Sequence, residues 1–427
     1  MARKGMHVAS AQERIFIAPL LTDQQRADKN QRAIWKSLSQ VSTDELNAQL
    51  AKSASGDYRG WLELSLIYKS SNHGLDSQLA KLNAWKDRWP NHPAAKQIPQ
   101  DLANLRDAAE HQPRKIAVLL PLSGREKPVS EAIRDGFMAA FFQSSGAGRP
   151  EVVFYDTNAS ADFIGIYQRA VADGAQAIIG PLLKENVKAL QSLPQLPVPT
   201  LALNTLDDAT PSPPGLYQFG LSLNDEAVQV ADIALAEQHQ RAVIIGVRTD
   251  WATRAADSFK SRWQQAGGQI LDEVWFFASG ADYASSIEHV LAVDQSRQRV
   301  QDLKRILGRS ISAEPRRRQD IDVIFFIGKA EQARIIKPMM MYYYADEIPI
   351  YATSSIYSGI ADATHDQDMN GIHFAEIPWV LDNQDALKNA IAAVGGSNSP
   401  FTRLYALGVD AFRLYPRLRQ LELFGNI

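Results

Sequence analysis

Apolar residues follow two different spacings along this chain, and the spacing changes before the middle. In the early part, apolar positions recur at helical spacing, as in Ile34, Trp35 and Leu38. Further on, short apolar runs alternate with longer amphipathic stretches. We therefore predict an all-α segment over residues 1–112, followed by an α/β domain over residues 113–427.

The helical segment contains a pattern typical of tetratricopeptide helices. The sequence matches the pattern W-x2-L-G-x2-Y at Trp61, Leu64, Ser65 and Tyr68, with serine in place of glycine. Pro90 closes the unit because proline has no N–H to continue a helix. An ordinary helical hairpin is the alternative. Both kinds of hairpin usually bind a partner or act as a spacer. About three helix pairs are close to the minimum for a stacked array, so we expect this segment to be the end of a longer one.

Eight short apolar runs mark the rest of the chain: Ile116–Leu120, Val152–Tyr155, Ala177–Ile179, Val198–Leu203, Ala242–Ile245, Val274–Phe277, Val323–Ile327 and Ile348–Ala352. Unbroken runs rich in β-branched residues are typical of strands that are buried on both faces of a parallel sheet. Amphipathic stretches between them, such as residues 132–142, predict helices. The repeated order of strand and helix predicts doubly wound parallel sheets.

So many strands rarely belong to one sheet, so we expect the α/β domain to have two lobes. A proline-rich loop at Pro211–Gly215 separates the two series of strands. Residues 217–222 and 371–377 are the expected crossing strands. We predict lobe 1 at residues 113–221 plus 377–427, and lobe 2 at residues 222–376.

Composition and charge narrow the classes of protein only a little. With 45% apolar and 22% charged residues, the chain is typical of a globular protein. A formal net charge of −3 gives no electrostatic reason to expect nucleic acid as a partner. The chain has no cysteine, and it shows neither a signal-peptide pattern nor an apolar stretch of membrane-spanning length. We expect either a cytosolic protein or a fragment without its export segment.

Motifs of known catalytic or cofactor chemistry are missing from the sequence. It contains no G-x-G-x-x-G, no G-x-x-x-x-G-K-[ST], no H-E-x-x-H and no G-x-S-x-G. Asp366–Gly371 matches the first half of a calcium loop, but position twelve, which needs a carboxylate, is Ile377. A polar turn explains that stretch better. We therefore expect no catalytic residue, no metal and no cofactor, and a protein that is not an enzyme.

Candidate binding residues lie in turns after predicted strands, where ligands meet the carboxyl ends of a parallel sheet. After the first strand, Ser123 and Gly124 offer a hydroxyl and a backbone N–H to an anion or a partner. A simple helix cap is the alternative role for Ser123. Arg125, Lys184 and Asn204 are the further candidates at this edge.

A second candidate surface is a basic stretch over residues 297–318. Its eight cations are Arg297, Arg299, Lys304, Arg305, Arg309, Arg316, Arg317 and Arg318, against Asp302 and Glu314. A solvated insertion is the default interpretation of such a stretch. The alternative is a docking surface for an acidic partner, with the last three arginines as candidates.

Several motifs resemble known families. Four motifs resemble the type I periplasmic-binding fold of branched-chain amino-acid receptors: Pro121–Gly124, Ala132–Phe137, Gly174–Pro181 and Tyr405–Ala411. The chain resembles the LpoA family more closely, and over essentially its whole length. The motifs that carry this resemblance are Leu20–Thr22, Ala33–Trp35, Ile179–Lys184, Leu201–Asn204 and Leu404–Leu421. Members are outer-membrane lipoproteins that activate a class A penicillin-binding protein, the bifunctional peptidoglycan synthase, from the periplasm.

The resemblance implies a fold, a partner and a location. The fold is a two-lobed type I periplasmic-binding-protein fold preceded by tetratricopeptide-like helices. The function is non-catalytic binding and activation of a class A penicillin-binding protein during cell-wall synthesis. The location is the periplasm, with outer-membrane attachment through a lipid anchor that this chain lacks. Members also carry a signal peptide, more helical repeats upstream and a strand pair beyond Gly425, so we expect a truncated or internally started form.

The alternative function is a solute-binding protein that delivers a small molecule, such as an amino acid, to a transporter. In the amino-acid receptors, the turn after the third strand usually supplies small hydroxyl residues to the ligand. Here Leu182–Glu185 occupies that turn. Bulky and charged side chains there would fill the cleft without matching polar groups, which favours the activator.

Overall fold

A computed structural model describes residues 6–418 except 54–55, 71–74, 105–111, 145–148, 207–209, 281, 311, 383–384 and 396–398. Contacts divide the chain into two compact units, Met1–Gly220 with Leu407–Ile427, and Leu221–Ala406. Residues 377–406, which we expect in lobe 1, group by these contacts with the second unit. The division into a helical segment and two lobes stays a prediction.

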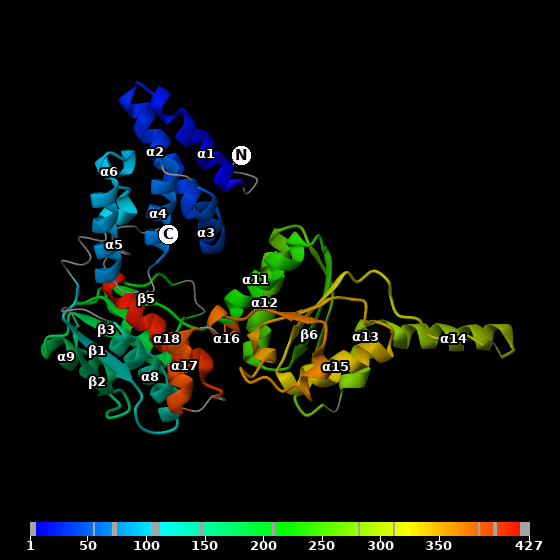
Figure 1. Cartoon of the computed structure of the whole chain (residues 1–427). Helices are drawn as coiled ribbons and strands as arrows, with labels where there is room; N and C mark the ends of the chain where they lie inside the picture. Colours follow the sequence, from blue (N-terminus) through cyan, green and yellow to red (C-terminus); the bar gives the residue numbers. More distant parts are fainter. Residues whose placement is uncertain are drawn as a thin grey trace. The chain divides into compact units, whose positions relative to one another are not determined.

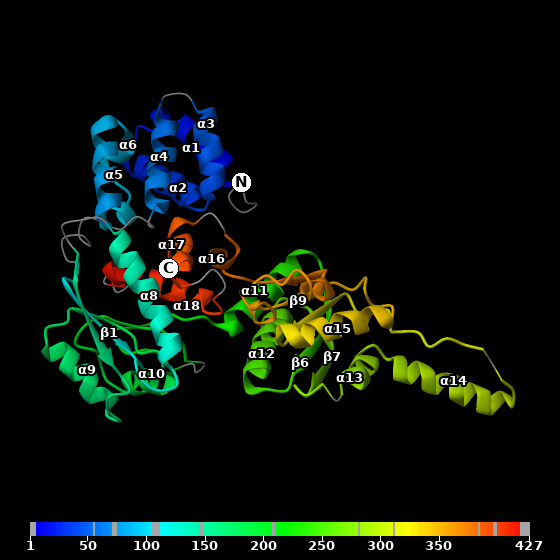
Figure 2. The same cartoon turned by 60° about the horizontal axis from the view of Figure 1, so that its bottom comes forward.

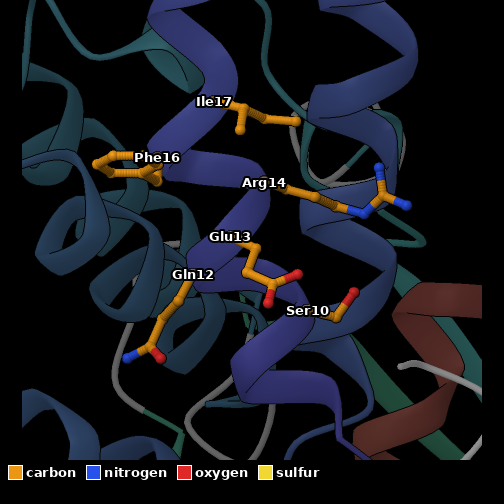
Figure 3. Close-up of a pocket in the computed structure, with 6 residues that line it drawn as sticks. All are labelled: Ser10, Gln12, Glu13, Arg14, Phe16 and Ile17. Carbon is orange, nitrogen blue, oxygen red and sulfur yellow. The ribbon is translucent and has the colours of Figure 1, made fainter.

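The first unit begins with a series of helices (Figure 1). Their bounds are α1 (His7–Ile17), α2 (Gln24–Ser39), α3 (Thr43–Lys52), α4 (Asp57–Lys69), α5 (Leu75–Arg88) and α6 (Pro93–Lys96). Asp23 accepts a hydrogen bond from the backbone N–H of Arg26 to start α2, and Ser42 does the same for Glu45 in α3. Helix α4 packs against α1, α2, α3 and α5, and α2 also packs against α1. The side chain of Arg14 in α1 points toward α2 (Figure 3). The backbone carbonyl of Arg14 accepts a 2.9 Å hydrogen bond from the Asn30 side chain of α2.

The tetratricopeptide-like pattern marks the buried face of α4. Trp61, Leu64 and Ser65 are buried, and the Ser65 hydroxyl donates to the Trp61 carbonyl at 2.9 Å. The serine that stands where the pattern has glycine is thus satisfied by its own helix. Trp85 of α5 donates from its indole N–H to the Gly60 carbonyl at 3.0 Å, which fixes α5 on α4.

A five-stranded parallel sheet completes the first unit. Its strands are β1 (Lys115–Leu120), β2 (Glu151–Asp156), β3 (Ala177–Ile179), β4 (Thr200–Ala202) and β5 (Leu216–Gln218), in the order β2-β1-β3-β4-β5. Helices α8 (Lys127–Gln143), α9 (Phe163–Ala172) and α10 (Lys184–Gln191) alternate with these strands. In the interior strand β1, Val118 pairs with Phe154 on one side and Ile179 on the other. Five of the six β1 residues are buried, which explains their continuous apolar run.

Helix α18 (Thr402–Leu414) brings its later part back to the first unit. Phe412 meets the ring of Phe137 edge-on, with ring centroids 5.2 Å apart. A Cβ added to Gly408 would lie 2.0 Å from the backbone oxygen of Ile133 in α8. The two helices therefore approach each other closely at a glycine.

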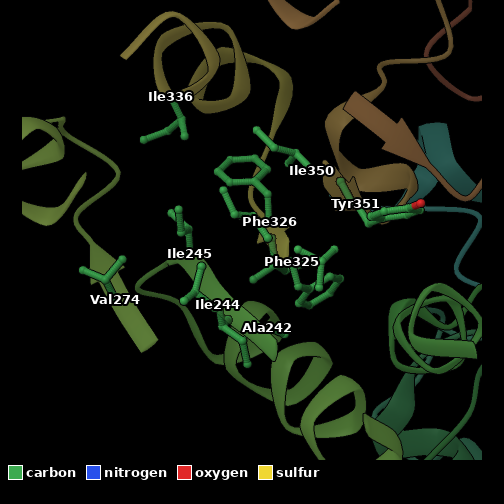
Figure 4. Packing of buried hydrophobic residues seen from close by; sticks show 14 of the residues in the cluster. Ala242, Ile244, Ile245, Val274, Phe325, Phe326, Ile336, Ile350 and Tyr351 are labelled. Carbon is green, nitrogen blue, oxygen red and sulfur yellow. The ribbon is translucent and has the colours of Figure 1, made fainter. Parts of the chain in front are cut away.

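The second unit contains another five-stranded parallel sheet. Its strands are β6 (Arg241–Val247), β7 (Gln269–Phe276), β8 (Val323–Ile327), β9 (Ile350–Ala352) and β10 (Ile372–Phe374), in the order β10-β9-β8-β6-β7. Its longer helices are α11 (Leu223–Ala236), α12 (Asp250–Gln265), α13 (Tyr283–Val290), α14 (Val293–Leu307), α15 (Ala330–Tyr342) and α17 (Ala386–Gly395). The rings of Phe259 and Phe325 stack at 4.2 Å. Figure 4 shows the side chains of β6 and β8 packed with Ile336 of α15.

The predicted fold class is confirmed. Each of the eight apolar runs overlaps a strand, and all strand pairs among the described residues are parallel. The expected crossing strands overlap β5 and β10 only in part, since β5 shares residues 217–218 and β10 shares residues 372–374 with them; each is paired at one edge of its sheet. Their role as crossings stays a prediction.

The close approach at Gly408 predicts that Gly408→Ala destabilises the first unit. Alanine favours an exposed helix interior by about 1 kcal/mol over glycine. Here the added methyl would collide with backbone, and overpacking costs typically about 1–3 kcal/mol. We expect the clash to prevail, so the free energy of unfolding falls in chemical denaturation followed by circular dichroism. Gln143→Ala at the exposed end of α8 is the control, and an equal or higher stability of Gly408→Ala would contradict the close approach.

Candidate functional site

The first candidate surface is the carboxyl edge of the first sheet. Ser123, Gly124 and Arg125 follow β1 and are exposed. Gly124 has a φ of +75°, a left-handed conformation that favours glycine. The Asn158 side chain, which follows β2, donates to the Ser123 carbonyl at 2.7 Å. The turns after two neighbouring strands are therefore joined by a side chain.

Asp156, at the end of β2, holds the first turn in place. One of its carboxylate oxygens accepts from the backbone N–H groups of Leu122 and Asn158, both at 2.9 Å. Burial alone would raise the pKa of Asp156. The hydrogen bonds from the Ser123 hydroxyl and from backbone N–H groups outweigh it and hold this pKa below its ordinary value. The Ser123 hydroxyl is thus engaged with a carboxylate of the same unit.

Lys184 and Asn204 lie at the same edge because β3 and β4 follow β1 in the sheet order. Lys184 is exposed at the start of α10. Asn204 is half-buried, and its amide donates to the Leu182 carbonyl at 2.9 Å and accepts from the N–H of Thr205. The topology thus gathers the five predicted residues at this edge. Both polar groups of the Asn204 side chain are already hydrogen-bonded within the turns after β3 and β4.

The corresponding edge of the second sheet carries a pocket that our sequence reasoning missed. It has a volume of about 300 Å³ and is lined by Leu223, Trp251, Lys329, Ala330, Glu331, Ser355 and Ser358. These residues follow β6, β8 and β9 or begin α11. Trp251 and Leu223 supply apolar surface, and Lys329 and Glu331 supply opposite charges. The rule that ligands meet the carboxyl ends of parallel strands, applied to the second series of strands, would have found it.

Beside this pocket, one arginine pairs with a buried carboxylate. Arg403 donates to the buried carboxylate of Glu376 and, from the same guanidinium, to the carbonyls of Ser354 and Tyr357 at 3.1 and 2.9 Å. Glu226 accepts from the N–H and the hydroxyl of Ser354 at 2.8 and 2.9 Å. Burial raises the pKa of Glu226, although the bonds from Ser354 lower it. This cluster ties α11, the end of β9 and the start of α18 together within the second unit.

The three consecutive arginines of the basic stretch do not form one free patch. The side chain of Arg317 is only 6% exposed and donates to Glu347 and to the Tyr344 carbonyl. Arg318 binds both carboxylate oxygens of Asp320, at 2.7 and 2.8 Å. Arg316 alone of the three is exposed. Their role in binding stays a prediction.

A larger hollow of about 730 Å³ lies along α1. It is lined by Ser10, Gln12, Glu13, Arg14, Phe16 and Ile17 (Figure 3). All of its lining residues come from one helix, so polar groups approach from one side only. A ligand pocket needs groups that converge from several elements, and this hollow therefore does not qualify.

Within the described residues, no group of three or more histidine, aspartate or glutamate side chains is arranged to hold a metal ion. In the same residues, no helix has the length and apolar character to cross a membrane.

The helices followed by two doubly wound parallel sheets define a protein of the periplasmic-binding-protein type with a helical amino-terminal segment. The chain belongs to the LppC putative lipoprotein family, whose model matches residues 1–425. It is 26% identical to the penicillin-binding protein activator LpoA of Photobacterium profundum, over all of this chain and 70% of the relative. The predicted relationship to the LpoA family is confirmed.

Solved structures show the same fold. The crystal structure of full-length LpoA from Haemophilus influenzae matches 98% of this chain and 71% of its own, with a TM-score of 0.57 and 24% identity. The C-domain of LpoA from the same organism, described as a regulator of PBP1A, matches 72% of this chain and 87% of its own, with a TM-score of 0.56 and 23% identity.

The buried cluster around Arg403 predicts a large loss of stability for Arg403→Met. The substitution leaves the Glu376 carboxylate buried without its partner, which typically costs about 3–5 kcal/mol. Denaturation of the whole chain, compared at equal protein concentration, measures this loss. Arg262→Met is the matched control because its partner Asp232 is exposed, and a change below about 1 kcal/mol is expected there. Equal effects of the two substitutions would contradict the structural role of Arg403.

The lowered pKa of Asp156 predicts a pH-dependent effect of Asp156→Asn. A carboxyl whose pKa falls on folding stabilises the native state above its ordinary pKa, and this contribution is lost as the pH falls through the folded value. We expect the substitution to cost about 1–3 kcal/mol at pH 7 and progressively less below pH 4. Exposed Asp135→Asn serves as the control. The same loss at pH 3 and pH 7 would show that the carboxylate charge does not hold the turn.

Proposed function

We propose that this protein is a non-catalytic regulator that binds a class A penicillin-binding protein and raises its rate of peptidoglycan synthesis. The observation that carries the proposal is membership of the LppC family over residues 1–425, together with relatives that are named penicillin-binding protein activators. The named activity of those relatives favours activation over solute binding. The partner is the synthase itself, and the protein makes or breaks no bonds.

The mechanism is a shift between conformations of the synthase. A binding protein changes an equilibrium only by its difference in affinity for the two states. A difference of about 1.4 kcal/mol changes the population ratio tenfold. Such an activator needs a preformed surface rather than a reactive group. The braced turns after β1, β3 and β4, with exposed Arg125 and Lys184, are a candidate for that surface.

The lipoprotein family supports a location in the cell envelope. We propose that the protein acts in the periplasm, attached to the outer membrane by a lipid anchor. The helices α1–α6 would act as a spacer between the anchor and the α/β part. This division of labour matches the predicted domains, residues 1–112 and 113–427.

The alternative is a solute-binding protein, and the pocket at Trp251 and Lys329 is the observation that favours it. An amino acid needs matched groups for its carboxylate and its ammonium. At the first sheet, both polar groups of Asn204 are engaged within the turns, and Leu182–Glu185 offers no small hydroxyl. A thermal-shift screen of amino acids and sugars distinguishes the two functions, since a bound solute raises the melting temperature.

The proposal predicts that the purified chain accelerates a purified class A penicillin-binding protein from the same organism. The measurement follows incorporation of labelled lipid II into peptidoglycan, with and without the chain, beside a direct binding titration. Heat-denatured chain is the control for nonspecific effects. Folded chain that neither binds the synthase nor changes its rate would rule out the proposed function.

A further inference from the structure

Helix α14 leaves the body of the second unit. Its first turn is anchored, because Val293 and Ser296 are buried. Figures 1 and 2 show, from two directions, that the helix then extends away from the rest of that unit. The returning segment closes the base, where the N–H of Arg316 donates to the Ser296 hydroxyl at 3.0 Å and that of Arg318 to the Leu291 carbonyl at 2.9 Å. We call residues 293–318 the arm.

An apolar stripe runs along α14 and continues past the point where the helix leaves the body. Alternate steps of three and four residues, the spacing of a coiled-coil seam, connect Val293, Ser296, Val300, Leu303 and Leu307. Leu303 and Leu307 are 49% and 50% exposed, and their neighbour Ile306 is 77% exposed. The seam is therefore covered at its base and uncovered at its outer end.

Cations without acidic partners flank the uncovered part of the stripe. Arg299 and Lys304 lie beside it on α14, and both are exposed. Among the described residues, neither has a carboxylate within 4 Å. By contrast, Arg297 pairs with Glu288 at 2.6 Å, and Arg305, on the face opposite the stripe, pairs with Asp302. The unmatched positive charge is thus concentrated along the edges of the apolar seam.

We propose that α14 docks by this seam on the synthase, in an apolar groove or on a helix face whose rims carry aspartate or glutamate. The inference rests on the proposed function and names the surface that contacts the partner. Charge complementarity identifies the rims, because Arg299 and Lys304 would each meet a carboxylate beside a desolvated apolar contact. The seam spacing identifies an apolar stripe of matching repeat on the partner.

The same charges disfavour two other occupants. A second copy of this chain, paired through the seam, would place Arg299 and Lys304 against the same cations, and like charges at these flanking positions repel. A membrane surface favours helices whose whole polar face is cationic. The polar face of α14 instead mixes Gln298 and Asp302 with Arg305.

The arm supplies one anchor of a larger interface. A helix of 15 residues is about 22 Å long, and stable complexes bury roughly 1,200–2,000 Å² in total. A few central apolar residues usually carry most of the affinity of such an interface. Truncating the exposed leucines should therefore weaken binding strongly while leaving the fold unchanged, because these side chains are half-exposed.

Three variants of the whole chain test the inference by titration against the purified synthase. Leu303→Ala with Leu307→Ala is expected to weaken binding about tenfold or more. Lys304→Glu is expected to weaken it about three- to tenfold, with an effect that shrinks as salt rises. Arg305→Glu reverses one charge at the next position on the opposite face, and this matched control should change the dissociation constant by less than about twofold. Circular dichroism confirms that all variants fold.

The outcomes separate this inference from the proposed function. If the unaltered chain binds and stimulates the synthase and the stripe variants do so equally well, the docking surface is wrong and the function stands. If the unaltered chain neither binds nor stimulates, both are overturned. Sedimentation that shows a dimer dissolved by the stripe variants would assign the seam to a second copy. Binding of the chain, but not the variants, to vesicles containing phosphatidylglycerol would assign it to a membrane.

Discussion

The burial of the central strands on both faces is the constraint on which the rest of the structure depends. Five of the six residues of β1 and all five of β8 are buried, and each strand is paired on both sides. A strand in this position must be apolar throughout, so it cannot carry binding chemistry along its length. Variable chemistry is confined to the turns beyond the strand ends. Here those turns are braced by Asp156, Asn204 and Ser355, which makes them fixed surfaces.

Charges in the second unit serve two different purposes. Arg403 and Arg317 are held by carboxylates and carbonyls of the same unit, where an unpaired charge would be costly. Arg299 and Lys304 are exposed on a helix that leaves the body, where they contribute little to folding stability. Cations of the second kind are available to a partner. Lys304 and Arg317, which belong to one basic stretch, therefore differ in whether their charge is used within the fold.

The strands could be predicted from the sequence because doubly buried strands leave a continuous apolar run. The prediction fails at partly exposed strand ends: β7 starts at Gln269, well before its apolar run, because its first half is only half-buried. The sequence also predicted the edge residues from Ser123 to Asn204, since topology alone brings the ends of parallel strands together. Their bonding partners were not predictable. Arg317 finds Glu347 across 30 residues of sequence, a pairing that no local pattern records.

The helices that we propose as a spacer are tied by hydrogen bonds to the carboxyl-terminal segment of the first unit. Arg417, which follows α18, donates at 2.6 Å to the side chain of Gln78 in α5. That same side chain donates to the carbonyls of Ile67 and Tyr68 at the end of α4, both at 2.8 Å. Burial lowers the pKa of Arg417, yet a guanidinium keeps its charge. Because a half-buried cation is costly unless it is hydrogen-bonded, this joint favours a single geometry between the helices and the carboxyl-terminal segment that closes the unit.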